Sequence, residues 1–212
     1  MFRVVVRRMC KNPENSYNSE EDFTCGEFVQ ELLRETKCGY EVVYDPQSVK
    51  GLCHYKKKEI ILTYLPETRT LWPLFQAGHE IGHAYYGPDF LFRYRALLLP
   101  VIPVLFLVPV CLGLTNQPTI HAFLFTICAC VFFLLGCYEI FSSEVKASLF
   151  ALEKLKSRVK TQKAVDKLTK RLKLDIWYNA LEIPAWFTVF TSSLWFFYLA
   201  ARYFSQKAGG AL

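Results

Sequence analysis

Three uncharged, apolar stretches of about twenty residues constrain this chain more than any other feature of its sequence. They occupy residues 96–114, 119–138 and 183–201. As helices, each would be about 28–30 Å long, which matches the hydrocarbon thickness of a bilayer. None keeps the polar face that a helix of a soluble bundle usually has. The sequence therefore predicts three membrane-spanning helices, with the lipid bilayer as a partner.

The distribution of charge predicts the orientation of these helices. The chain has 25 Lys and Arg residues against 19 Asp and Glu, and the basic excess lies in residues 142–182. Arg93 and Arg95 precede the first stretch, whereas residues 115–118, which link the first two, carry no charge. Because basic residues concentrate on the cytoplasmic side of membrane helices, we expect a multi-pass integral protein, of the cell membrane, with its polar parts in the cytoplasm. No nucleic-acid-binding module is recognisable, so we expect no nucleic-acid partner.

These segments predict one domain that is α+β and mainly helical, a small cytoplasmic portion on a three-helix transmembrane anchor. The cytoplasmic α+β region spans residues 1–95, and a transmembrane hairpin follows at 96–141. A basic helical region spans 142–182, and residues 183–212 form the third transmembrane helix with a short tail. The eight cysteines form no C-x-x-C pair, and in the cytoplasm we expect free thiols.

Local patterns predict the elements of the polar regions. Helices are predicted at residues 26–36, 71–86 and 142–175, the last with a break near 161–162. Strands are predicted at residues 40–44, 51–55 and 59–63, the last two as a hairpin. Residues 59–63 could be an edge strand that pairs with an extended peptide, or simply a strand of the sheet. Residues 154–173 alternate apolar and basic residues, so this helix lies either on anionic lipid or on the polar portion.

The helix predicted at 71–86 contains His79-Glu80-Ile81-Gly82-His83. Histidines four residues apart lie on one helix face, where both imidazoles can reach one zinc ion. Glu80 is then placed to take a proton from water that zinc activates. The pattern predicts a Zn²⁺ site with His79 and His83 as metal ligands and Glu80 as the catalytic base.

A catalytic zinc usually takes three protein ligands, and the third must lie elsewhere in the chain. Glu139 and Glu144 stand where the second apolar stretch returns to the cytoplasm. They are about 140° apart around a helix, so both cannot face one ion. His54 is a further alternative, whereas His121 lies near the outer end of the second stretch. The residues alone leave Glu144, Glu139 and His54 open.

The motif His79-Glu80-Ile81-Gly82-His83-Ala84 resembles the H-E-V-G-H-A of the YugP-like neutral zinc metallopeptidases. The resemblance covers most of the chain, in four further places: residues 24–29 with Leu32 and Leu33, His54-Tyr55, Arg95-Ala96-Leu97 with Pro100, and residues 144–148 with Ala151 and Leu152. The last of these is similar to the family's E-F-D-A-S-x-x-A-L, and its combination with the His motif points to this family. The HtpX-like membrane proteases share the same order of His motif, membrane hairpin and Glu ligand more distantly.

The resemblance implies Glu144 as the third zinc ligand and a zincin-like fold for the cytoplasmic portion. It implies a membrane-embedded zinc endopeptidase that hydrolyses peptide bonds of peptide or protein substrates at the cytoplasmic face. Lys146, Cys53 and Lys56 depart from the family's motifs, each standing where the family has an acidic residue. These departures motivate the alternative of a catalytically inactive membrane scaffold or adaptor that retains the peptidase fold.

Overall fold

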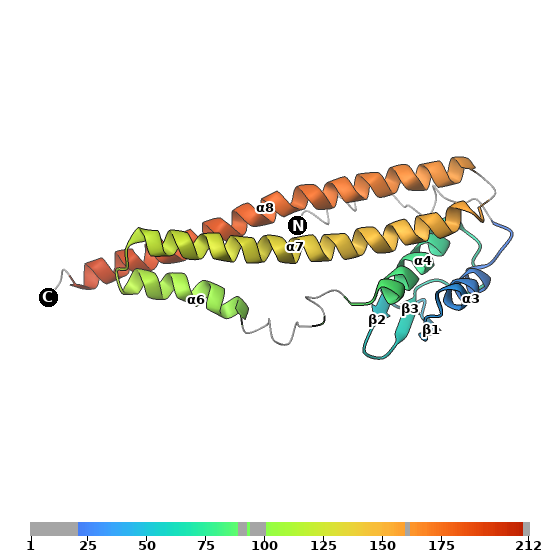
Figure 1. Ribbon diagram of the computed structural model, residues 1–212, viewed down its shortest axis with the longest axis horizontal. Coiled ribbons are helices and arrows are strands. Elements are labelled where there is room, and N and C mark those ends of the chain that lie inside the picture. Colours follow the sequence, from blue (N-terminus) through green and yellow to red (C-terminus); the bar gives the residue numbers. More distant parts are fainter. Residues whose placement is uncertain (1–20, 89–92, 94–100, 160–161, 210–212) are drawn as a thin grey trace. The chain divides into compact units, whose positions relative to one another are not determined.

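The computed structural model describes residues 21–88, 93, 101–159 and 162–209. The prediction of a mainly helical α+β chain is confirmed, with a small three-stranded sheet (Figure 1). The described residues form two compact units. The first takes residues up to Pro88 and Ser143–Asp175, and the second takes those between Asp89 and Ser142 and from Ile176 onwards. Predictions for residues 1–20, and for residues 96–100 of the first apolar stretch, fall outside the described part.

Helix α3 (Cys25–Thr36) of the first unit begins at a capping box. The Thr24 backbone N–H donates to Glu27 Oε2 at 2.7 Å, and the Glu27 N–H donates to Thr24 Oγ1 at 3.2 Å. These two bonds satisfy donors that a helix start otherwise leaves unpaired. Phe28, Val29 and Leu32 are buried, as the amphipathic pattern predicts.

The sheet contains strands β1 (Glu41–Tyr44), β2 (Leu52–His54) and β3 (Glu59–Leu62) in the order β1-β3-β2. The predicted hairpin is confirmed, because β2 and β3 pair antiparallel. Strand β1 pairs parallel with β3 on its other side. The hypothesis that residues 59–63 form an edge strand is therefore wrong. Both sides of β3 are already hydrogen-bonded, so β3 has no free edge for a peptide.

Helix α4 (Leu71–Tyr86) matches its predicted bounds and packs against α3, β2 and β3. It ends at Gly87, which has a φ of 76° and donates its N–H to the His83 carbonyl at 2.9 Å. A residue with a side chain rarely adopts this backbone conformation. Leu71, Leu74 and Ile81 are fully buried, so the helix lies in the core of the first unit.

Two long helices contribute their charged ends to the first unit. They are α7 (Thr119–Lys156) and α8 (Gln162–Gly209), and the break predicted near 161–162 lies between them. Beyond the end of α7, Arg158 forms ion pairs with Glu31 and Glu35 of α3. Val165 and Leu168 at the start of α8 are buried. Of the two interpretations of this basic segment, burial of its apolar face favours a helix packed on protein.

The cysteines in the described residues are all free. Cys25 at the start of α3 and Cys53 in β2 are buried. Burial raises the pKa of each thiol to about 12, because a thiolate is poorly solvated there. Both side chains therefore act as small apolar residues of the core.

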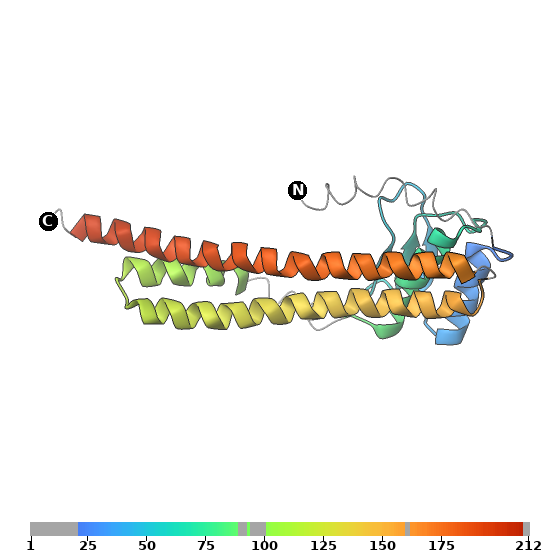
Figure 2. The ribbon, with the colours of Figure 1, turned by 90° about the horizontal axis from the view of Figure 1, so that it is seen from above.

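The second unit consists of α6 (Val101–Leu114), the first part of α7 and the second part of α8, which lie side by side (Figure 2). Aromatic rings connect them: Phe106 of α6 lies against Phe190 and Phe197 of α8, and Phe133 of α7 stacks on Phe190 at 4.8 Å. The turn between α6 and α7 is fixed by Tyr198 of α8, which donates to the Gln117 carbonyl at 3.0 Å.

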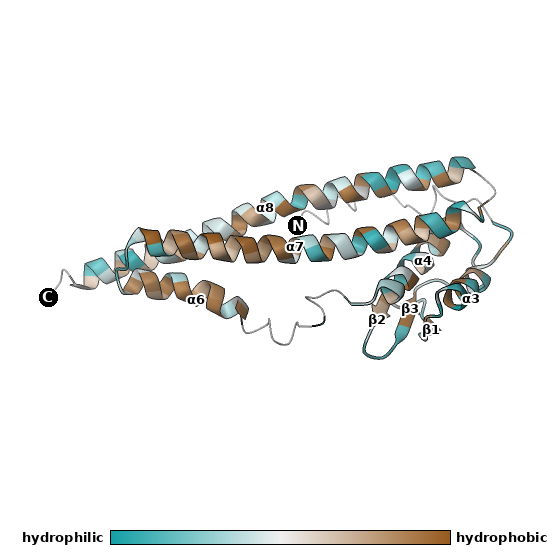
Figure 3. Ribbon diagram, in the orientation of Figure 1, coloured by the Kyte–Doolittle hydropathy of each residue, from teal (hydrophilic) through white to brown (hydrophobic). Residues whose placement is uncertain are grey.

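Most residues of the helices in this second unit are hydrophobic (Figure 3), and many of their large apolar side chains are exposed. Helices α7 and α8 are both long and apolar enough to cross a membrane, and only 11% of the most apolar window of each is buried. A core helix of a soluble protein would have most of that surface covered. The first predicted span appears as the apolar helix α6, of 14 described residues.

Candidate metal site

Helix α4 brings its two histidines together on one face. The side chains of His79 and His83 are 18% and 12% exposed, and their Nε2 atoms lie 3.1 Å apart. The rings meet edge to face, with centroids 4.7 Å apart. Both imidazoles therefore direct Nε2 to one point, as the i, i+4 spacing predicts.

Glu144 of α7 completes the cluster. Its Oε2 lies 3.3 Å from His79 Nε2, and its Oε1 lies 3.6 Å from His83 Nε2. Two ligands of a tetrahedral ion with bonds of about 2.0–2.1 Å are about 3.3–3.4 Å apart. Each histidine Nε2 lies at about this distance from the other Nε2 and from one of the two Glu144 oxygens, so His79, His83 and Glu144 could hold a metal ion.

Two glycines of α4 let α7 approach closely enough for this contact. A Cβ on Gly78 would lie 3.0 Å from the Cβ of Ala151, and one on Gly82 would lie 2.9 Å from the Cα of Ala147. Because the distance between packed helices depends on the side chains at the contact, these four small residues place the two backbones almost in touch. The Glu144 carboxylate thereby reaches the imidazoles.

The electrostatics of Glu144 favour its charged form. Hydrogen bonds from His79 and His83 hold the pKa of this carboxyl well below its usual range, although burial opposes them. The side chain remains 55% exposed. A carboxylate that stays ionised and is open on one side is suited to binding a cation.

Glu80 lies beside the cluster and is covered by the backbone of the loop before β2. A Cβ on Gly51 would lie 3.1 Å from Glu80 Oε1, so a larger residue there would push the carboxylate by a few tenths of an ångström. Burial raises the pKa of Glu80, and Glu144 adds to this, whereas His79, His83 and Lys50 oppose it. A raised pKa makes this carboxylate a stronger base than an exposed one.

Two serine hydroxyls of α7 lie at the opposite ring nitrogens of the histidines. Ser148 Oγ is 3.0 Å from His79 Nδ1, and Ser143 Oγ is 3.5 Å from His83 Nδ1. Sequence reasoning missed both as functional residues. Their spacing in the sequence could have indicated them. Ser143 directly precedes Glu144, and Ser148 follows Glu144 by one helical turn, so both lie beside Glu144 on the helix.

The other residues considered as ligands are not in this cluster. His54 ends β2, where it pairs with Glu59 of β3. Glu139 lies on α7 five residues before Glu144, which places it on another face of the same unbroken helix. His121 is an exposed residue near the start of α7, in the second unit.

Tyr85 and Tyr86, at the end of α4, are about half exposed and pack on Phe150. Tyr178 belongs to the second unit.

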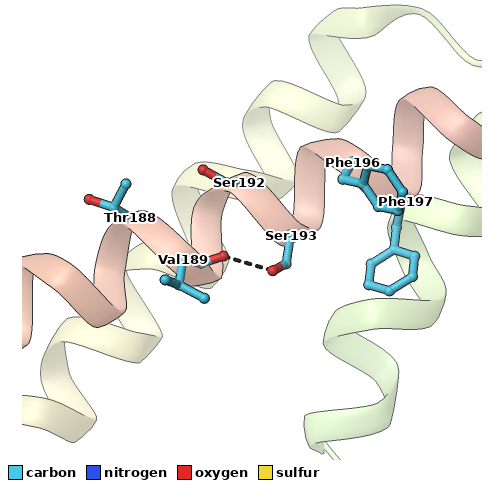
Figure 4. A pocket seen from close by; sticks show the side chains of 6 residues that line it. All are labelled: Thr188, Val189, Ser192, Ser193, Phe196 and Phe197. Carbon is cyan, nitrogen blue, oxygen red and sulfur yellow. Dashed lines mark hydrogen bonds between the residues drawn. The ribbon is translucent and has the colours of Figure 1, made fainter. Parts of the chain in front are cut away.

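A surface hollow in the second unit is lined entirely by residues of α8 (Figure 4), and none of these residues is an acid, a base or a metal ligand. Its lining residues are Thr188, Val189, Ser192, Ser193, Phe196 and Phe197.

Comparison of the chain with protein-family models, with curated proteins and with solved structures finds no match. What the site can do therefore follows from its own residues: two imidazoles and a carboxylate that could hold a metal, beside a buried carboxylate of raised pKa.

Gly82→Ala tests the close approach of α4 and α7. The new methyl would have to move the Ala147 backbone, and such overpacking costs about 1–3 kcal/mol. We expect a lower melting temperature and weaker metal binding, measured by thermal unfolding and by metal titration. Gly39→Ala is the control, because a Cβ there meets nothing within 4 Å. Wild-type metal affinity in Gly82→Ala would contradict the argument.

Proposed function

We propose that this chain is a membrane-anchored zinc endopeptidase that hydrolyses peptide bonds with Glu80 as general base. The observation that carries the proposal is the meeting of His79, His83 and Glu144, whose ligand atoms lie close enough together to hold one metal ion. Two imidazoles and one carboxylate are a usual ligand set of catalytic zinc, and three ligands leave the fourth position open. The choice of zinc rests on these ligand types.

When bound, zinc polarises the scissile carbonyl and lowers the pKa of the attacking water. The chain supplies the proton transfers. The Glu80 carboxylate takes a proton from the water while the water oxygen forms a bond to the carbonyl carbon. Glu80 then gives that proton to the peptide nitrogen as the C–N bond breaks. The raised pKa of Glu80 suits both transfers. Glu144 is more than half exposed, which leaves an approach for a substrate on that side.

The apolar second unit supports the proposal of a membrane anchor. Helices α7 and α8 have the length and composition of spans, and little of their apolar surface is covered. We place α6 as a third span, with residues 115–118 outside the cell and the basic residues in the cytoplasm. The first unit, with its zincin-like α4 and its metal ligands, then faces the cytoplasm and acts on peptide or protein substrates there.

The same residues support assignment to the YugP-like zinc metallopeptidases. Ser148 and Ala147 of the Glu-x-x-Ala-Ser motif both have places in the site, one beside His79 and one against Gly82. Lys146, which departs from the family's motif, is exposed. The inactive scaffold remains the alternative function, and it differs from the enzyme in cleaving nothing.

Metal content is the first test. Mass spectrometry of the detergent-purified chain should find about one zinc per molecule. His83→Ala and Glu144→Ala should each lose it, because two ligands hold zinc poorly. Glu139→Ala is the matched control on the same helix and should keep it. A folded wild-type protein that binds no metal would end the peptidase proposal.

Glu80→Gln separates the enzyme from the scaffold. The variant should keep its zinc, while cleavage of a library of internally quenched fluorescent peptides should fall about 100- to 10,000-fold, as loss of a general base predicts. Glu59→Gln, a half-buried strand residue, is the control and should retain wild-type rates. If the zinc-loaded wild type cleaves no better than Glu80→Gln, the scaffold is the correct reading.

The membrane anchor predicts both fractionation and sidedness. The chain should stay in the membrane pellet after an alkaline carbonate wash. A membrane-impermeant maleimide should label Thr115→Cys, in the turn between α6 and α7, in intact cells. Lys57→Cys, in the turn between β2 and β3, should be labelled only after permeabilisation, with the wild type giving the background of native thiols. Labelling in the opposite order would reverse the orientation, and release by carbonate would remove the anchor.

A further inference from the structure

One segment of α7 contacts both ring nitrogens of each histidine. Glu144 meets the Nε2 atoms of His79 and His83. Ser148 meets the Nδ1 of His79, and Ser143 meets the Nδ1 of His83. Residues 143–148 of α7 therefore supply the polar groups that contact the two imidazoles from that helix.

A neutral imidazole has one N–H and one lone pair, and a metal ion needs the lone pair. If Nε2 binds the ion, Nδ1 carries the proton, and its N–H needs an acceptor for a hydrogen bond. A histidine ligand almost always has such an acceptor, which fixes its tautomer and its ring orientation. The Ser148 hydroxyl oxygen, 3.0 Å from His79 Nδ1, is placed to accept this bond.

The two serines differ in how easily a water molecule could take the place of the hydroxyl as the hydrogen-bond partner of the histidine. Ser148 is buried, with 8% of its surface exposed, so a His79 N–H without this hydroxyl would be left unpaired. A buried donor without a partner costs about 1–3 kcal/mol. Ser143 is only partly buried, and its 3.5 Å separation from His83 Nδ1 is at the limit of a hydrogen bond.

We propose that Ser148 is a positioning residue for the metal ion, which holds His79 in the tautomer and orientation that present the Nε2 lone pair. Ser143 does the same for His83 with a smaller effect. Neither serine is a ligand, and neither takes part in the proton transfers. This inference rests on the metal site of the proposed function. It adds that Ser148 helps to set how tightly that site binds the metal ion.

The test is zinc affinity of the full-length protein in detergent, measured by competition with a chromophoric chelator. Ser148→Ala should bind zinc about 10- to 100-fold more weakly, the usual cost of losing such a partner. Ser143→Ala should lose less than Ser148→Ala. Ser157→Ala, which removes a hydroxyl just beyond the end of α7, is the control and should match the wild type. Ser148→Thr keeps the hydroxyl and should recover most of the affinity.

Two further measurements separate positioning from general damage to the fold. The melting temperature of the metal-free Ser148→Ala protein should fall by no more than about 2–12 °C, because an unpaired donor costs about 1–3 kcal/mol and each kcal/mol shifts the melting temperature of a chain of this size by about 2–4 °C. The visible absorption bands of bound Co²⁺ should change in Ser148→Ala and return in Ser148→Thr, because a reoriented imidazole alters the ligand geometry.

Equal zinc affinity and equal Co²⁺ spectra in Ser148→Ala and the wild type would overturn the role of Ser148 and leave the metal site standing. A weaker affinity that Ser148→Thr and Ser157→Ala share would also overturn it. A wild-type protein that binds neither zinc nor Co²⁺ would overturn both the inference and the proposed function.

Discussion

The near contact between the backbones of α4 and α7 is the constraint on which the site depends. Two glycines one turn apart on α4 face two alanines one turn apart on α7, and a methyl group at Gly82 would already be too close. Side chains as short as a glutamate and a serine reach the histidines only because the helices meet this closely. The glycine within the His motif thus has a packing role, separate from the chemistry of its neighbours.

Much of the polar part could be predicted from local patterns, because its elements have clear starts and stops. Helix α4 begins and ends at its predicted residues, since Gly87 stops it. The site was only partly predictable: the i, i+4 spacing brings His79 and His83 together by itself, whereas the partner on α7 depends on how two distant helices pack. Geometry alone excluded a site that used both Glu139 and Glu144, but it could not choose between them.

The open question about β3 and the two missed serines have the same origin. The hairpin with β2 by itself leaves one side of β3 open, and only the parallel pairing with β1 fills that side. The roles of Ser143 and Ser148 likewise exist only once α4 lies against α7. The second partner of β3 and the histidine contacts of the two serines both depend on segments distant in the chain, which local sequence patterns do not identify.

The separation of the site's components along the chain has a consequence for biosynthesis. His79 and Ser148 are 69 residues apart, and the apolar residues of α6 and the first part of α7 lie between them in the sequence. A nascent chain emerges from its N-terminus, so the histidine helix exists well before its partner segment has been made. An ion held by all three side chains can therefore be captured only late in synthesis, after the hydrophobic segments have left the ribosome.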